Sequence, residues 1–321
     1  MKLKWAILGA LLTMIAVLTG CEPLAVLDPK GPQAQTQADV IWISIAIMSF
    51  IVITVFAMLI YMLIKYRASK QPDSYEPPHI EGSAIVEAIC VGIPILIVTV
   101  LSVISVQSTY KVEATPEVYK DKEPLVIYAS SSDWKWHFSY PEENIETVNY
   151  LYIPTDRPLE FRLYSHGAIT SFWIPQLGGQ KYAMSDMITT LHLGADSPGE
   201  FMGRNANFSG EGFAENTFNV KAMPQQEFAD WVKEVKQTAK PLTEDKFVEL
   251  LEPGHLGQLT FTGTHLDFMP PPEGHHGGEG THGSNTDGHS MGQHEKTDED
   301  QTDSSEANRS QTTENHHEGQ H

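Results

Sequence analysis

The sequence predicts two transmembrane helices followed by an all-β Greek-key sandwich with a small helical appendage. Two long apolar runs indicate the helices, and a series of short strand-like segments between turn residues indicates the sandwich. Apolar residues almost disappear after residue 270, which marks a polar tail. With 321 residues, the chain has room for membrane segments, one ordinary domain and this tail.

The first 20 residues have the pattern of a secretory signal. Two lysines precede the apolar run from Trp5 to Leu18, and small residues stand directly before Cys21. This ending resembles the lipobox of bacterial lipoproteins, in which the cysteine is diacylated and becomes the new N-terminus. We therefore expect a lipoprotein signal peptide over 1–20 and a lipidated N-terminal segment over 21–39, anchored at Cys21. An uncleaved anchor helix with an incidental cysteine is the alternative.

Two apolar runs are long enough to cross a bilayer, residues 40–64 and residues 85–106. A helix rises 1.5 Å per residue, so each run can cross a hydrocarbon core of roughly 30 Å. The second run carries Glu87 near its start and Pro94 in its interior. Neighbouring helices can tolerate the kink that this proline should cause.

The loop between the runs, residues 65–84, predicts the orientation of the chain. It contains Lys65, Arg67 and Lys70, and an excess of positive residues in a short loop marks the cytoplasmic side. Cys21 is expected on the opposite side, which agrees with this assignment. The chain after about residue 107 should therefore lie on the outer face of the membrane.

The outer part is predicted to hold a sandwich over 115–223 and a helical appendage over 224–269. Apolar positions within 225–240 share one face at three- and four-residue steps, and Thr243 can cap a short helix over 243–251. The predicted strands are 125–129, 134–140, 148–153, 158–164 and 187–193.

The tail, residues 270–321, is predicted to be disordered because it has too few apolar residues to form a core. It is acidic, with 11 Asp or Glu against 2 Lys or Arg, and rich in histidine. Histidine-rich tracts can bind zinc, copper or nickel, although a solvated extension is the simpler interpretation. The formal net charge of −20 argues against nucleic acid as a partner.

The helical hairpin followed by Asp133–Trp136 and Ser171–Gly178 resembles subunit II of the heme–copper respiratory oxidases. The segments 180–193 and 198–213, together with the lipobox and the terminal helices, resemble its quinol oxidase branch in particular. The resemblance implies that the outer domain is a cupredoxin-like sandwich.

In the copper-bearing branch of this family, a dinuclear copper is held by two bridging cysteines, two histidines, a methionine and a backbone carbonyl. This chain has no cysteine between Val91 and His321, and a copper electron-transfer site needs thiolate. We therefore expect no metal and no cofactor in this chain, with His166 and His192 as structural or surface histidines. The resemblance places the lost ligand positions at Thr170, Phe208, Gly210, Gly212, Asn216 and Asn219.

The resemblance also suggests roles for three other residues. Glu87 stands seven residues before Pro94, a spacing that marks the entrance of a proton channel in the family. An interfacial carboxylate that reaches toward lipid headgroups is the alternative. Trp134 and Trp136 match an aromatic patch that contacts cytochrome c in the copper-bearing branch. Here they are candidates for packing or for docking partner subunits.

The resemblance implies that this chain is subunit II of a bacterial quinol oxidase complex, a quinol:oxygen oxidoreductase of the EC 1.10.3 type. The complex would oxidise a membrane quinol, menaquinol or ubiquinol, reduce oxygen to water and move protons. The hemes, the copper of the oxygen site and the quinol pocket are expected in subunit I. The expected partners are subunit I, further membrane subunits and membrane lipid, but not cytochrome c.

Two other functions are alternatives to this expectation. A copper-bearing cytochrome c oxidase subunit is disfavoured by the missing cysteines. A membrane-anchored metal-binding or copper-delivery lipoprotein that uses the histidine-rich tail is the alternative from a different class.

Overall fold

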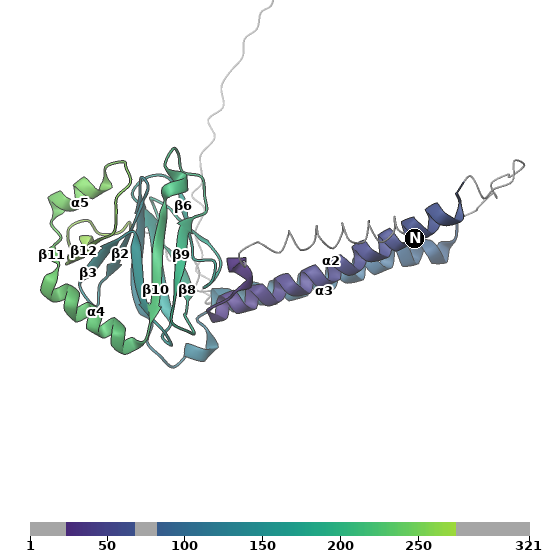
Figure 1. Ribbon diagram of the computed structural model, residues 1–321, viewed down its shortest axis with the longest axis horizontal. Coiled ribbons are helices and arrows are strands. Elements are labelled where there is room, and N and C mark those ends of the chain that lie inside the picture. The colour runs from purple at the N-terminus through teal and green to yellow at the C-terminus, as the bar shows by residue number, and fades with distance from the viewer. Residues whose placement is uncertain (1–23, 68–81, 274–321) are drawn as a thin grey trace, which may run out of the picture. The chain divides into compact units, whose positions relative to one another are not determined.

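The structure is a computed structural model that describes residues 24–67 and 82–273 (Figure 1). The predicted signal peptide, the lipidation site Cys21, loop residues 68–81 and the tail from residue 274 onward lie outside the described residues.

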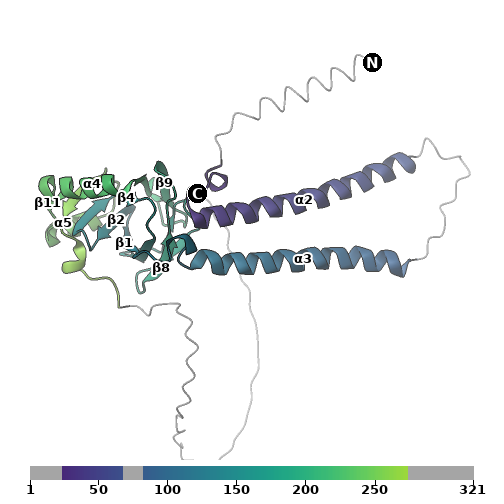
Figure 2. The same ribbon diagram turned by 90° about the horizontal axis from the view of Figure 1, so that it is seen from below.

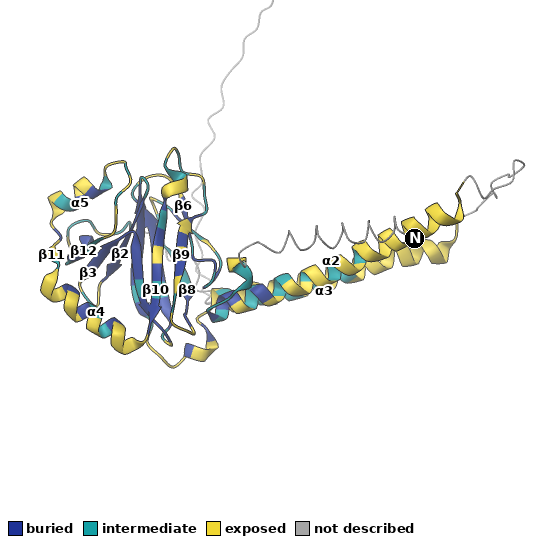
Figure 3. Cartoon of the chain, in the orientation of Figure 1, coloured by how far each residue is buried: buried dark blue, intermediate teal, exposed yellow. Residues whose placement is uncertain are grey.

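Two helices form the predicted hairpin, α2 (Pro32–Lys65) and α3 (Ala84–Glu113), and Figure 2 shows them side by side. Both are long and apolar enough to cross a membrane. Many large apolar residues of both helices are exposed, and Figure 3 colours most of α2 and α3 as exposed. Such a surface suits contact with lipid or with partner helices. Both helices are longer than the apolar runs. Helix α2 begins at Pro32, because proline at the first helical position costs no hydrogen bond and presets φ.

The outer domain is a sandwich of a seven-stranded sheet, ordered β11-β12-β3-β2-β1-β5-β8, and a five-stranded sheet, ordered β4-β10-β9-β6-β7 (Figure 1). Three of the strand pairings are parallel: β1 with β5, β4 with β10, and β11 with β12. The strands are β1 (Leu125–Ser132), β2 (Lys135–Tyr140), β3 (Ile145–Val148), β4 (Tyr150–Pro154), β5 (Leu159–Ser165), β6 (Thr170–Trp173), β7 (Lys181–Ala183), β8 (Thr189–Leu193), β9 (Gly199–Asn205), β10 (Thr217–Met223), β11 (Lys240–Pro241) and β12 (Leu259–Thr262).

Aromatic side chains from both sheets fill the space between them. Trp136 and Phe138 of β2 face Phe172 of β6 and Phe218 of β10, and all four are buried. The Phe172 and Phe218 rings stack with centroids 5.2 Å apart. Each such ring removes a large apolar area from water, so this cluster dominates the stability of the sandwich.

The predicted strand over 148–153 is wrong as a single strand, because the chain turns at Asn149. This residue has a φ of 58°, a left-handed conformation that asparagine tolerates. Its Oδ1 accepts from the backbone N–H of Trp136 at 3.0 Å, and its Nδ2 donates to the Leu256 carbonyl at 2.7 Å. The turn sends β3 and β4 into different sheets.

The appendage contains the two predicted helices, α4 (Gln225–Thr238) and α5 (Glu244–Leu251). Thr243 caps α5 as expected, since its Oγ1 accepts from the backbone N–H of Lys246 at 3.3 Å. The appendage is not wholly helical. Strand β12 returns to the sheet and pairs antiparallel with β3, with Leu259 opposite Val148. Phe247, Leu250 and Phe261 form a second small core there.

The start of α2 packs directly on the sandwich. The Lys30 and Ala34 backbone N–H groups donate to the carbonyls of Gln176 and Leu177 at 2.7 and 3.2 Å. Gly31 permits this approach, because a Cβ atom there would lie 2.0 Å from the Gly194 carbonyl oxygen. Part of the predicted lipidated N-terminal segment, residues 21–39, therefore forms a joint between the membrane hairpin and the outer domain.

Candidate functional site

The six residues that the resemblance matches to copper ligands lie at the start of β6, in the loop between β9 and β10, and in β10 itself. Thr170 is buried, and its hydroxyl shares a 2.6 Å hydrogen bond with the Ser131 hydroxyl. Phe208 is 77% exposed, with its ring 5.6 Å from that of Phe213. The Phe208 ring therefore lies largely on the surface.

Trp134 covers the two glycines of this loop. A Cβ atom at Gly212 would lie 2.3 Å from the Trp134 ring, and Gly210 has a φ of 104°, where glycine is favoured. The indole Nε1 of Trp134 donates to the Ser209 carbonyl at 3.1 Å. Glycine at position 212 thus lets the indole pack flat on the loop.

Trp136, by contrast, is completely buried in the sandwich, so it packs within the chain and presents no docking surface.

The remaining two positions carry amides. Asn216 is buried, and its side-chain atoms have no hydrogen-bond partner among residues 24–67 and 82–273. Asn219 is exposed on β10. Across all six positions there is no thiolate, imidazole or thioether. The residues present therefore do not fit a dinuclear copper centre. In the part of the chain that the structure describes, no cluster of three or more His, Cys, Asp or Glu side chains is placed to hold a metal ion.

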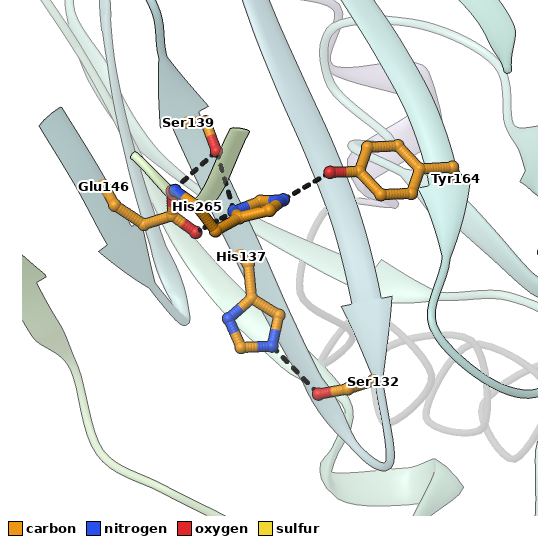
Figure 4. A network of polar contacts seen from close by, with 6 residues as sticks. All are labelled: Ser132, His137, Ser139, Glu146, Tyr164 and His265. Carbon is orange, nitrogen blue, oxygen red and sulfur yellow. Dashed lines mark hydrogen bonds and ion pairs between the residues drawn. The ribbon is translucent and has the colours of Figure 1, made fainter. Parts of the chain in front are cut away.

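A buried polar network lies where β12 and the short helix η5 (His265–Asp267) meet the seven-stranded sheet (Figure 4). The Nδ1 atom of His265 lies 2.6 Å from Oε1 of Glu146, while Ser139 Oγ donates to Oε2 of the same carboxylate at 2.6 Å. The Tyr164 hydroxyl contacts Nε2 of His265. The carboxylate of Glu146 thus accepts hydrogen bonds from the Ser139 hydroxyl and from Nδ1 of His265.

Two further histidines border this network around Phe247. Burial lowers the pKa of His137 well below its usual value and lowers the pKa of His166 to about 4. Nδ1 of His137 and Nε2 of His166 are buried and have no hydrogen-bond partner among the described residues. Both rings are therefore neutral at pH 7. The expectation that His166 is structural stays a prediction, and sequence reasoning did not single out His137 or His265 at all.

Lys135 fastens the appendage to the sandwich. Its Nζ donates to the backbone carbonyls of Asp133, Glu252 and Gly254 at 2.8, 2.6 and 2.9 Å. Burial lowers the pKa of this lysine. The three carbonyls would be left without this donor if the side chain were removed, so the residue is a structural clamp.

Glu87 lies in the first turn of α3 and is exposed. Its backbone N–H donates to the Ser83 carbonyl at 3.0 Å, and its carboxylate stands where the helix dipole favours negative charge. This position suits a group that meets water or a partner subunit at the membrane boundary.

The fold defines the class of protein: a membrane hairpin that carries an outer β-sandwich. Residues 24–108 match the family of the cytochrome c oxidase subunit II transmembrane domain. The chain is 51% identical over 269 residues to quinol oxidase subunit 2 of Bacillus subtilis (strain 168), covering 83% of this chain and 84% of that protein. It is 46% identical over 272 residues to quinol oxidase subunit 2 of Bacillus anthracis, covering 84% and 94%. The chain belongs to the quinol oxidase subunit 2 family.

Among solved structures, the periplasmic domain of subunit II of cytochrome oxidase from Bradyrhizobium japonicum is similar. It shares 21% identity at a TM-score of 0.35, and the match covers 36% of this chain and 96% of that chain.

Proposed function

We propose that this chain is the copper-free subunit II of a bacterial quinol oxidase complex. The complex oxidises a membrane quinol, reduces oxygen to water and translocates protons. The observation that carries this proposal is the 51% identity to a quinol oxidase subunit 2 across most of both chains. The cysteine-free outer domain supports the same branch.

Copper is unnecessary in this subunit for a physical reason. A quinol is lipid-soluble and delivers its electrons within the bilayer, so no relay at the outer surface is required. At the six positions that the resemblance matches to copper ligands, no side chain could hold a metal or another group that stores an electron. We therefore assign the hemes, the copper of the oxygen site and the catalytic centres to a partner subunit I.

Two further roles belong to this proposal. Glu87 supplies the entrance of a proton path into the partner subunit, because an exposed carboxylate at a span boundary is costly unless it meets water or a partner.

Cys21 carries the lipid anchor on the outer face. A single acyl chain binds membranes weakly, so α2 and α3 provide the stable attachment.

Mild detergent purification through this chain tests the proposal. We expect it to bring down a heme-containing complex that oxidises short-chain quinols and does not oxidise reduced cytochrome c. A mixed-valence dicopper signal in the electron paramagnetic resonance spectrum of this polypeptide would contradict it. Isolation of the chain without heme proteins would favour the metal-delivery alternative.

A further inference from the structure

An open groove with aromatic walls lies between helix α4 and the strands β4 and β12. Its volume is about 620 Å³, and Tyr150, Tyr152 and Trp231 supply the aromatic side chains of its lining. A second hollow of about 210 Å³ shares Tyr152 and Gln258 with it. The larger volume lies within the range of roughly 300–1,000 Å³ that is typical of ligand sites. The groove therefore has room for a ligand of more than one ring.

The three aromatic rings, which we call the aromatic platform, are inclined to one another. The rings of Tyr150 and Tyr152 have centroids 4.9 Å apart at an interplanar angle of 67°, and those of Tyr152 and Trp231 are 5.2 Å apart at 57°. Because neither pair is stacked face to face, the rings leave part of their faces uncovered. Tyr152 and Trp231 are only half-buried, so a ligand in the groove can contact them. The negative face of an aromatic ring attracts the polarised C–H groups of such a ligand.

Buried contacts fix the aromatic platform in place. The hydroxyl of the fully buried Tyr140 donates to the Tyr152 carbonyl at 2.9 Å and accepts from the Tyr152 backbone N–H at 3.0 Å. The Tyr140 ring also lies 5.7 Å from that of Trp231. The Tyr150 hydroxyl shares a hydrogen bond with the Thr260 hydroxyl. A platform that is already ordered loses little conformational entropy when a ligand binds.

Polar groups beside the aromatic platform are available to a ligand. The Glu234 carboxylate, the Gln258 amide and the Tyr152 hydroxyl belong to residues that line the groove, and none of them bonds to another residue within 24–67 or 82–273. A carboxylate only accepts hydrogen bonds, whereas an amide and a phenol both donate and accept. A ligand that satisfies all of these groups must therefore carry donors as well as acceptors.

The charges around the groove favour a neutral ligand. Glu234 lines the larger hollow and Glu200 the smaller one, so both would repel a phosphate or another anion. The amine of Lys221 pairs with Glu227 at 2.8 Å and lies 5.8 Å from the centroid of the Tyr152 ring. A cationic ligand on the same ring would be repelled by this amine.

Two neutral ligands suit a groove with aromatic walls, a proline-rich peptide and a sugar. Proline has no N–H, so a proline-rich segment offers mainly acceptors, and the carboxylates of Glu234 and Glu200 would find few donors. A sugar ring carries C–H groups on its face and hydroxyls around its rim, and each hydroxyl both donates and accepts. The sugar therefore matches the aromatic platform and the polar groups together.

The groove lies at the sandwich edge opposite to the membrane helices. Strand β4 is one edge of the five-stranded sheet, and β7 is the other edge, where Lys181 pairs with Glu113 of α3 at 3.4 Å. In the seven-stranded sheet, β12 lies next to the edge strand β11, and the opposite edge strand β8 contacts α3. A large ligand on the outer side can therefore reach the groove without meeting the bilayer.

We propose that this groove binds a neutral oligosaccharide on the outer side of the membrane. One sugar ring packs against Tyr152 and Trp231, and its hydroxyls bond to Glu234 and Gln258. The inference goes beyond the proposed function, because it gives the subunit a second ligand and involves neither quinol nor heme. Binding of this kind would attach the outer domain to glycan outside the membrane.

Isothermal titration calorimetry of the full chain with maltotetraose, cellotetraose and chitotetraose tests the proposal. A polyoxyethylene detergent is required, because the sugar headgroup of a maltoside detergent would compete for the groove. We expect saturable binding of at least one tetrasaccharide. Glu234→Ala and Gln258→Ala should each weaken it by about 3- to 10-fold, since each variant loses a hydrogen bond to the sugar. Gln237→Ala is the matched control, because Gln237 is exposed on α4 and does not line the groove.

A second pair of variants tests the aromatic platform. Trp231→Ala removes one ring and should weaken binding by about 10-fold or more, as is usual when a tryptophan anchor is truncated. Trp231→Phe keeps a ring at this position and should recover part of the affinity. Trp231 also packs against Tyr140 and Phe228, so the melting temperature of both variants is measured alongside. Glu234 and Gln258 are exposed, and their variants should melt like wild type.

Three results would overturn the inference. The first is that none of the three tetrasaccharides binds at millimolar concentration. The second is that Glu234→Ala and Gln258→Ala bind as tightly as Gln237→Ala, which would place the sugar elsewhere. The third is binding of a proline-rich peptide or of polyphosphate that these variants weaken, without any binding of sugar. None of these measurements involves quinol oxidation, so a failure of the proposed function would be seen separately, in the oxidase assay of the purified complex.

Discussion

His265 and Glu146 form a fully buried pair, with Nδ1 and Oε1 2.6 Å apart, although the two residues are 119 positions apart in the sequence. The pair joins the short helix η5 to strand β3 of the sandwich (Figure 4). The backbone N–H of His265 also donates to Oε2 of Glu146 at 3.2 Å. A single carboxylate therefore holds both the ring and the backbone of η5.

Replacing this carboxylate should weaken the outer domain. Glu146→Ala leaves the ring Nδ1 and the backbone N–H of His265 buried without their acceptor, and each such unsatisfied group costs about 1–3 kcal/mol. Glu143→Ala is the matched control, since Glu143 forms a partly exposed pair with Lys236 that should contribute less than about 1 kcal/mol. Denaturant unfolding of the full chain in detergent measures both. Equal losses in the two variants would contradict the role of the network.

The stability of the outer domain should depend on pH through His166. Burial lowers its pKa to about 4 in the folded chain from 6.5 in the unfolded chain, so the unfolded chain binds a proton first as pH falls. The stability that the neutral ring contributes is complete above pH 6.5 and is lost as pH falls toward about 4. The difference between the melting temperatures of the full chain at pH 7.5 and pH 5 should therefore be smaller in His166→Gln than in wild type, and the part that remains belongs to His137, whose pKa burial also lowers. His255→Gln serves as the control, because His255 is exposed, and its melting temperatures at pH 7.5 and pH 5 should differ as much as those of wild type.

The packing of Trp134 on the β9–β10 loop makes Gly212 intolerant of a side chain. Gly212→Ala places a Cβ atom 2.3 Å from the indole, so the ring or the loop must move. Overpacking of this kind costs about 1–3 kcal/mol. Gly257→Ala, where a Cβ atom meets nothing within 4 Å, should leave the melting temperature almost unchanged. An unchanged melting temperature in Gly212→Ala would mean that the indole does not hold this loop.

Glu87→Gln should slow oxygen consumption by the assembled complex. The amide keeps the size of the side chain but cannot carry a proton in this pH range, so proton delivery is reduced. Glu117→Gln is the control, because Glu117 is exposed in the short helix η3 (Glu117–Tyr119) after α3. Unchanged turnover and unchanged proton uptake in Glu87→Gln would remove the proton-entry role.

Much of the architecture follows from local sequence patterns. The apolar runs predicted α2 and α3, and the spacing of apolar residues predicted α4 and α5. The cap at Thr243 could be assigned because capping depends on residues three positions apart. The match of six residues to copper-ligand positions rests on the resemblance and stays a prediction.

Other features had no local signal. The break at Asn149 looked like part of a continuous strand, because the residues on both sides of it, Val148 and Tyr150, are good strand formers. Strand β12 was missed for a related reason: its pairing with β3 depends on residues more than a hundred positions away.

The sequence by itself determined the membrane hairpin, the sandwich class and the absence of thiolate ligands in the outer domain, since length, periodicity and composition are local properties. Only the tertiary structure decided that the buried Gln33 side chain has no hydrogen-bond partner among the described residues and that His265 meets Glu146. Burial and pairing arise when distant segments close on one another, and a polar side chain has the same appearance in the sequence whether it faces water or a cavity.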